Sequence, residues 1–166
     1  QHIKRDRATS NICTAQVLLA IMAGFYGVYH GPHGLRRIAM RVHTLTTALG
    51  RGLQQLGHDT GQGTWFDTLK VNVEGSDIDG IHERAVEAGY NLRRFDNGES
   101  IGISFDETSK REDVLALLTV FSNGENIEFD PFDGLENVSD DLPEALHRRS
   151  GYLEQAVFNS YHSETE

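Results

Sequence analysis

Residues 7–17 read Arg7-Ala8-Thr9-Ser10-Asn11-Ile12-Cys13-Thr14-Ala15-Gln16-Val17, a polar loop that turns into the start of a long, largely apolar helix. Ser10 and Asn11 are both candidate N-caps, because a short side-chain oxygen there accepts a hydrogen bond from an N–H group of the first turn. Cys13 then falls in that first turn, where the helix dipole favours a thiolate. Lone cysteines are more commonly small buried hydrophobes, so we expect packing before reactivity at Cys13.

Two long helices are predicted from this start. The first covers residues 12–30 and carries small or apolar side chains on nearly every side, which is typical of a helix buried all round, here or in a parent chain. Gly31-Pro32-His33-Gly34 then breaks it, and Pro32 suits the first turn of the second helix. Residues 35–56 carry a one-faced apolar stripe that ends at Gly57, a left-handed C-cap. We expect the first helix to expose apolar surface or to bury it against another copy.

A β-α-β-β-α unit follows the two helices. Strands are predicted over residues 66–73, 91–95 and 100–105, with Asn97-Gly98 in the turn between the last two. A helix over 78–88 has Asp77 as its N-cap, and a helix over 111–121 has Ser109 as its N-cap with Glu112 completing a capping box. This order predicts an α+β fold, with a small, mainly antiparallel sheet and helices on one face.

The remainder is acidic and turn-rich. Residues 122–141 predict an extended surface segment with few fixed contacts, and residues 142–147 one helical turn. The chain begins at Gln1 and ends just after Val157-Phe158-Asn159-Ser160-Tyr161-His162-Ser163-Glu164-Thr165, which holds groups that need burial, so we expect a piece of a longer polypeptide. We divide it into a connecting helix (1–30), a small α+β domain (31–121), and an acidic extended segment with a tail that packs on absent parts of the parent chain (122–166).

Composition excludes several classes of function. The 166 residues carry a formal net charge of −10, which disfavours binding to nucleic acid or to an anionic membrane. A single cysteine allows no internal disulfide and gives a thiol-redox protein no resolving partner. We find no signal peptide, and the apolar run over residues 17–28 is too short to span a bilayer.

No catalytic, cofactor-binding or metal-binding set emerges from the motifs. Gly61-Gln62-Gly63 precedes a strand, whereas phosphate-binding loops lie between a strand and a helix. His30 and His33 lack further ligands at a convincing spacing, so helix-end solvation explains them better than a metal. A Schiff base with pyridoxal phosphate needs a lysine, and Lys4, Lys70 and Lys110 all have settings unlike that of a cofactor lysine.

Residues 1–16 closely resemble a segment of the P-protein family of the glycine cleavage system, the glycine dehydrogenases (decarboxylating). The resemblance continues through residues 28–32 and 34–35 and resumes over 157–166. It implies a pyridoxal-phosphate enzyme that decarboxylates glycine and passes the aminomethyl group to the lipoyl arm of H-protein. It also implies two copies of the fold-type-I aminotransferase architecture, of which only the later copy holds the cofactor lysine. This chain resembles the end of the earlier copy, namely the connecting helix and a small C-terminal domain.

By that resemblance, the chain is a noncatalytic structural part of the enzyme and holds no cofactor itself. The alternative is a protein-interaction module that assembles the two enzyme halves or docks a carrier protein. The expected partners are the cofactor-binding half and lipoylated H-protein, with self-association through the first helix as a further candidate. The compartment is the cytoplasm in a bacterium and the mitochondrion in a eukaryote. Candidate cleft or interface residues, for which capping and packing are equally good accounts, are Ser10, Asn11, Cys13, Thr14, His162, Ser163 and Glu164.

Overall fold

The computed structural model describes residues 14–61, 64–73, 77–96, 98–135, 142–163 and 165. The chain forms two compact units, which we describe separately. The sheet unit comprises residues 38–147, and the tail unit comprises residues up to 37 together with residues from 148 onward. Ser10, Asn11, Cys13 and Glu164 lie outside the described residues.

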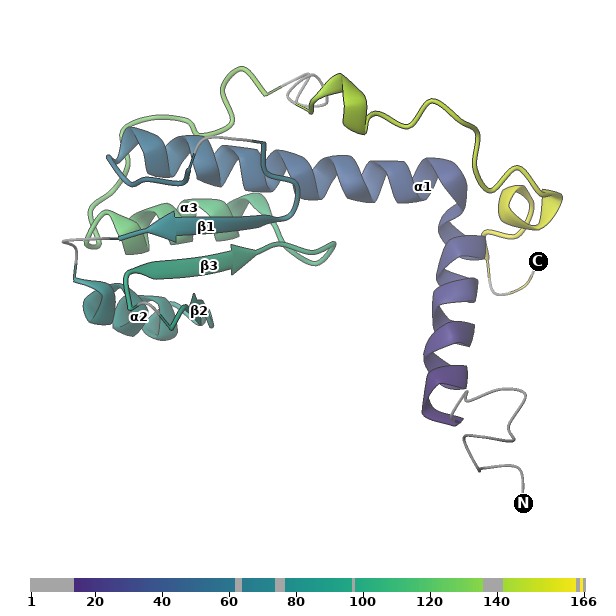
Figure 1. Ribbon diagram of the computed structural model, residues 1–166, viewed down its shortest axis with the longest axis horizontal. Helices are drawn as coiled ribbons and strands as arrows, with labels where there is room; N and C mark the ends of the chain where they lie inside the picture. The colour runs from purple at the N-terminus through teal and green to yellow at the C-terminus, as the bar shows by residue number, and fades with distance from the viewer. Residues whose placement is uncertain are drawn as a thin grey trace. The chain divides into compact units, whose positions relative to one another are not determined.

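The first helical element, α1 (Thr14–Gln55), is interrupted at Gly31, whose φ of 59° and ψ of −178° are not helical. Figure 1 shows α1 turning sharply within the tail unit at this point. Pro32 resumes the helix, where its missing N–H breaks no hydrogen bond. The prediction of two long helices separated at Gly31-Pro32 is therefore confirmed. Gly57 has a φ of 88°, in agreement with the predicted left-handed cap.

A three-stranded antiparallel sheet forms one layer of the sheet unit, with the strand order β1-β3-β2. Its strands are β1 (Thr68–Asn72), β2 (Arg93–Arg94) and β3 (Ser100–Ser104). Leu69 lies opposite Ile103 and Val71 opposite Ile101, so the buried aliphatic side chains of β1 and β3 share one face. All three strands fall within the predicted ranges, although β2 is shorter than expected.

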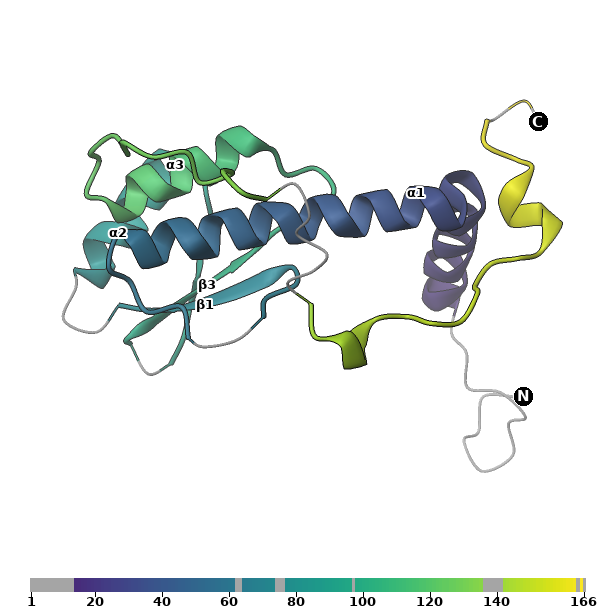
Figure 2. The same cartoon turned by 90° about the horizontal axis from the view of Figure 1, so that it is seen from above.

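Helices cover only one face of this sheet, as predicted. Along β1, Leu69 and Val71 are buried while Thr68, Lys70 and Asn72 are exposed, which is the alternation of a half-buried strand. Figure 2 shows the later part of α1 with α2 (Ile78–Glu87) and α3 (Arg111–Phe121) on the same side of the strands. Gly52 of α1 allows a close approach, because a Cβ there would lie 2.8 Å from a methyl carbon of Leu118.

Helix α2 has the predicted ends. The backbone N–H of Gly80 donates to Oδ1 of Asp77 at 3.0 Å, so Asp77 is the N-cap. Gly89 follows the helix with a φ of 88°, a conformation that glycine adopts without strain. The expected capping signals on both sides of this helix are confirmed.

The predicted cap of α3 is wrong by one residue. The N-cap is Lys110, whose backbone N–H donates to Oδ2 of Asp113 at 2.7 Å, so Asp113 takes the place predicted for Glu112. Ser109 belongs to the preceding turn, since its hydroxyl accepts from the N–H of Asp106 at 3.1 Å. Tyr90 donates its hydroxyl to Oδ1 of Asp113 at 2.8 Å. Burial, and then Asp113, raise the pKa of Tyr90 to about 12, so this hydroxyl remains a donor at neutral pH.

The expectation that residues 122–141 make few fixed contacts is wrong for the part that the structure describes. Phe132 and Leu135 are buried in the core of the sheet unit. The guanidinium of Arg111 lies 3.7 Å from the ring centroid of Phe132, within the range of a cation–π contact. Isolated apolar residues in an acidic stretch carry no periodic signal, which explains the error. The single turn predicted over 142–147 is confirmed as the 3-10 helix η2 (Glu144–Leu146).

Two leucines of α3 test the packing of the core. Leu118 has none of its surface exposed, whereas Leu115 on the same helix is 42% exposed. We expect Leu118→Ala to lower the free energy of unfolding by about 2–5 kcal/mol, because it removes buried methyl groups and leaves a cavity. Leu115→Ala is the matched control and should cost roughly 1 kcal/mol or less. Urea denaturation of both variants measures the difference, and equal losses would contradict the assigned core.

The shifted capping box gives a second prediction. Asp113→Ala removes the acceptor of both the Lys110 N–H and the Tyr90 hydroxyl, so we expect a loss of roughly 1–3 kcal/mol in stability. Glu112→Ala, the neighbouring exposed carboxylate, should change stability by no more than about 0.5 kcal/mol. Thermal unfolding of the two variants separates the assignments. A larger loss in the Glu112 variant would restore the cap predicted from sequence.

Candidate functional site: a cationic hollow at the helix break

The part of α1 before Gly31 presents apolar side chains to solvent. Phe25 is 71% exposed and Leu19 is 65% exposed. This confirms, for the described residues, that the first helix exposes apolar surface. Contiguous exposed apolar surface marks an interaction site in proteins. We call this surface the apolar face; it consists of Val17, Leu18, Leu19, Ile21, Met22, Phe25, Tyr26 and Tyr29.

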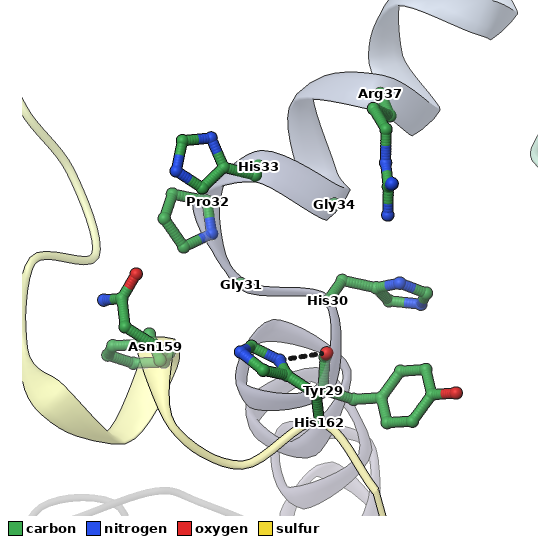
Figure 3. A pocket seen from close by; sticks show the side chains of 10 residues that line it. Tyr29, His30, Gly31, Pro32, His33, Gly34, Arg37, Asn159 and His162 are labelled. Carbon is green, nitrogen blue, oxygen red and sulfur yellow. Dashed lines mark hydrogen bonds between the residues drawn. The ribbon is translucent and has the colours of Figure 1, made fainter.

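The tail, by which we mean the chain from residue 148 onward, forms hydrogen bonds with α1 on both sides of the helix break. The Tyr152 hydroxyl donates to the backbone carbonyl of Pro32 at 2.7 Å. Nδ1 of His162 lies 2.9 Å from the carbonyl oxygen of Tyr29, the bond drawn in Figure 3. Because a carbonyl oxygen only accepts, Nδ1 of His162 must carry the hydrogen.

Gly31 allows the tail to come this close. A Cβ at Gly31 would lie 2.5 Å from the carbonyl oxygen of Phe158, a distance that no side chain tolerates. Its φ of 59° also lies in the region that favours glycine. Phe158 itself belongs to a short 3-10 helix, η3 (Ala156–Asn159), which was not predicted from the sequence. The glycine at this position therefore serves both the break in α1 and the contact with η3.

A hollow of about 420 Å³ lies at the break and is lined by residues 29–34, Arg37, Phe158, Asn159 and His162. Four of these side chains are basic or can become so, namely Arg37, His30, His33 and His162. None of the described residues in this lining carries a carboxylate. Figure 3 shows the four basic side chains around the bend, with the Arg37 side chain directed toward His30. We call this site the kink hollow.

The surroundings of the four basic groups differ. His30 is half-buried and packs against two aromatic rings, with centroid distances of 4.3 Å to Tyr26 and 5.0 Å to Tyr29. His33 and Arg37 are exposed, and Arg37 forms no ion pair with any residue that the structure describes. Among the described residues, therefore, no carboxylate compensates the charge of the Arg37 guanidinium.

The structure places one of the predicted site residues in this hollow. His162 lines it, whereas Ser163 follows His162 in the chain and contacts Thr165 through their hydroxyls at 3.5 Å. Thr14 is the first residue of α1, and the other four candidates, Ser10, Asn11, Cys13 and Glu164, lie outside the described residues. Sequence reasoning missed Arg37 and Asn159, and interpreted His30 and His33 as helix-end residues only. The one available sequence signal for this hollow was the placement of His30 and His33 on either side of Gly31-Pro32.

Metal ligands do not cluster among the described residues, and the two lysines among them lie at the surface. No group of three or more histidine, cysteine or acidic side chains among them is placed to hold a metal ion. The Lys70 ammonium lies 5.2 Å from the ring centroid of Phe95 on the open sheet face, and Lys110 is exposed at the start of α3. Lys110 lines two open hollows at the start of α3, of about 440 Å³ and 450 Å³. Among the described residues, no helix has the length and apolar character of a membrane span.

Comparison with known proteins extends the sequence resemblance. The family model described as glycine cleavage system P-protein matches residues 1–121. The chain is 52% identical to glycine dehydrogenase (decarboxylating) of Cupriavidus metallidurans, 50% identical to that of Synechocystis sp. and 51% identical to that of Stenotrophomonas maltophilia. Each alignment covers 100% of this chain but only 17%, 17% and 16% of the respective relative. The chain therefore spans a small part of the proteins that it resembles.

The glycine at the break yields a third prediction. Gly31→Ala should detach the tail, because the new methyl group meets the Phe158 carbonyl and the backbone conformation becomes strained. Hydrogen exchange of the amides in residues 152–162 should accelerate by about tenfold or more, which corresponds to a strain above roughly 1.4 kcal/mol.

Gly24→Ala is the matched control, since nothing lies within 4 Å of a Cβ at Gly24 and the residue is within the helix. This variant should leave the tail protected and stabilise the helix by about 0.5–1 kcal/mol. Unchanged protection of the tail in the Gly31 variant would show that the contact with Phe158 is not what holds it.

Proposed function

This chain belongs to the glycine cleavage system P-protein family, and we propose that it is a noncatalytic structural part of a glycine dehydrogenase (decarboxylating). The intact enzyme would decarboxylate glycine with pyridoxal phosphate and transfer the aminomethyl group to lipoylated H-protein. Its bacterial relatives support the cytoplasm as the compartment in preference to the mitochondrion. The contribution of this chain is a packing surface for the rest of the enzyme.

The observation that carries this proposal is the apolar face of α1. Eight large apolar or aromatic side chains between Val17 and Tyr29 are exposed there. Burying such side chains stabilises an assembly by roughly 25 cal/mol per Å² of apolar area removed from water. The relatives are about six times as long as this chain, so the remainder of the polypeptide is the natural partner for this surface. We therefore propose that the cofactor-binding half of the P-protein covers the apolar face.

The lysines support a noncatalytic role. Lys70 lies on an open sheet face and Lys110 at an exposed helix start, so we propose that residues outside this chain hold the cofactor. No step of the reaction is assigned to the residues described here. We propose that the candidate residues lie at the cleft wall or at the interface in the assembled enzyme; they are Ser10, Asn11, Cys13, Thr14, His162, Ser163 and Glu164. The hydrogen bond between Nδ1 of His162 and the Tyr29 carbonyl supports this placement, because it holds the imidazole in one orientation.

Complementation of a divided enzyme tests the proposal. We expect this chain, combined with the separately produced remainder of a P-protein, to form a stable complex that decarboxylates glycine when lipoylated H-protein is present. The chain by itself should be inactive. Phe25→Asp should weaken the complex by about 100-fold or more, because it places a charge in an apolar interface.

Val86→Asp is the control, since Val86 is 63% exposed on α2, outside the apolar face. It should leave the affinity unchanged, as measured by isothermal titration calorimetry. Failure of the chain to bind the remainder would overturn the proposal. Retention of lipoylated H-protein by this chain alone would instead support the carrier-docking alternative, and dimerisation lost in the Phe25 variant would assign the apolar face to self-association.

A further inference from the structure

We propose that the kink hollow binds a small oxyanion, either a phosphate group or a carboxylate. The side chains that would recognise it are Arg37, His30, His33 and His162, which lie around one hollow of about 420 Å³. The hollow shares Tyr29 with the apolar face and His162 with the proposed cleft wall, but binding of an anion there requires no step of the reaction proposed for the intact enzyme.

Charge is the first argument. The chain as a whole carries a net charge of −10, yet the described residues that line the kink hollow include one arginine, three histidines and no carboxylate. A guanidinium presents N–H donors in a planar fork that matches the oxygens of phosphate and carboxylate groups. Arg37 is exposed and has no ion pair among the described residues, so its fork is available to a ligand. A local field of this sign in an acidic protein favours a small anion over a cation.

The rings of two histidines of the hollow are held in place. The Tyr29 carbonyl accepts from Nδ1 of His162, so this ring can present only its Nε2 to a ligand. The rings of Tyr26 and Tyr29 pack against His30. Because packing already holds His30 and His162, less side-chain entropy is lost when a ligand binds.

Backbone geometry holds the two sides of the hollow together. Gly31 contacts the Phe158 carbonyl too closely for any other residue, and Tyr152 bonds to the carbonyl of Pro32. The basic groups of α1 and His162 of the tail are therefore held in one arrangement within the tail unit. A metal ion is the competing ligand for three histidines, but the positive charge of Arg37 opposes it, and no described group has the arrangement of a metal site.

Titration of this chain with inorganic phosphate, followed through the imidazole NMR signals of the histidines, tests the inference. Sodium chloride at matched ionic strength is the baseline, and sodium acetate forms the second arm. We expect saturable shifts of the His30 and His162 signals with phosphate. Saturation with acetate as well would identify the carboxylate as a further source of the oxyanion, and its absence would restrict the site to phosphate groups. Non-saturable shifts with both anions would overturn the proposal.

Two neighbouring arginines provide matched variants. Arg37→Gln should weaken phosphate binding by about tenfold or more, because it removes a charge-assisted donor pair. Arg36→Gln removes the adjacent exposed arginine, which does not line the hollow, and should change the affinity by less than about twofold. Arg37→Lys retains the charge without the fork and should give intermediate binding. Equal effects of the Arg36 and Arg37 variants would mean that phosphate responds only to overall charge, which would also overturn the proposal.

Discussion

Gly31 carries a φ of 59° in the middle of a 42-residue helical element, and the carbonyl of Phe158 occupies the space that any Cβ would need. Gly31 separates two helical segments that differ in the exposure of their apolar side chains. The segment before it exposes large apolar side chains, whereas the segment after it places Leu45, Leu49 and Leu53 in the core of the sheet unit. In a continuous straight helix there would be no bend against which residues 158–162 of the tail could pack. The break therefore determines both the apolar face and the kink hollow.

The sheet unit buries the apolar face of its sheet under its own helices. One face of the three-stranded sheet packs under α1, α2 and α3, and the alternation along β1 leaves the other face polar. Phe95 on this open face lies between two cationic side chains, with Arg93 4.7 Å and Lys70 5.2 Å from its ring centroid. The half-buried aromatic ring is thus shielded by side chains of the same unit. The described part of the sheet unit also exposes large apolar side chains, but they come from separate segments, whereas eight lie within residues 17–29 of α1; those of the sheet unit are Phe66, Val86, Leu115 and Leu146.

Much of the fold could be predicted from the sequence because local signals and burial agreed. Asp77 and Gly89 mark the two ends of α2 through side-chain and backbone chemistry that neighbouring residues alone determine. The cap of α3 was misplaced because Ser109 and Lys110 compete for one position, and only the turn formed by Asp106 decides between them. Phe132 and Leu135 could not be placed, since their burial depends on contacts with residues distant in the sequence, such as Arg111.

The kink hollow shows the same limit more sharply. His30 and His33 are three positions apart, and this spacing alone indicates only the end of a helix. Their relation to His162, more than 120 residues away, arises from the hydrogen bond to Tyr29 with its sequence separation of 133 residues. Net charge is uninformative for a related reason, because the value of −10 averages over the whole chain, whereas the described lining of the hollow has basic side chains and no carboxylate. Over distances shorter than the roughly 8–10 Å screening length of physiological salt, a ligand responds to the local groups and not to the average.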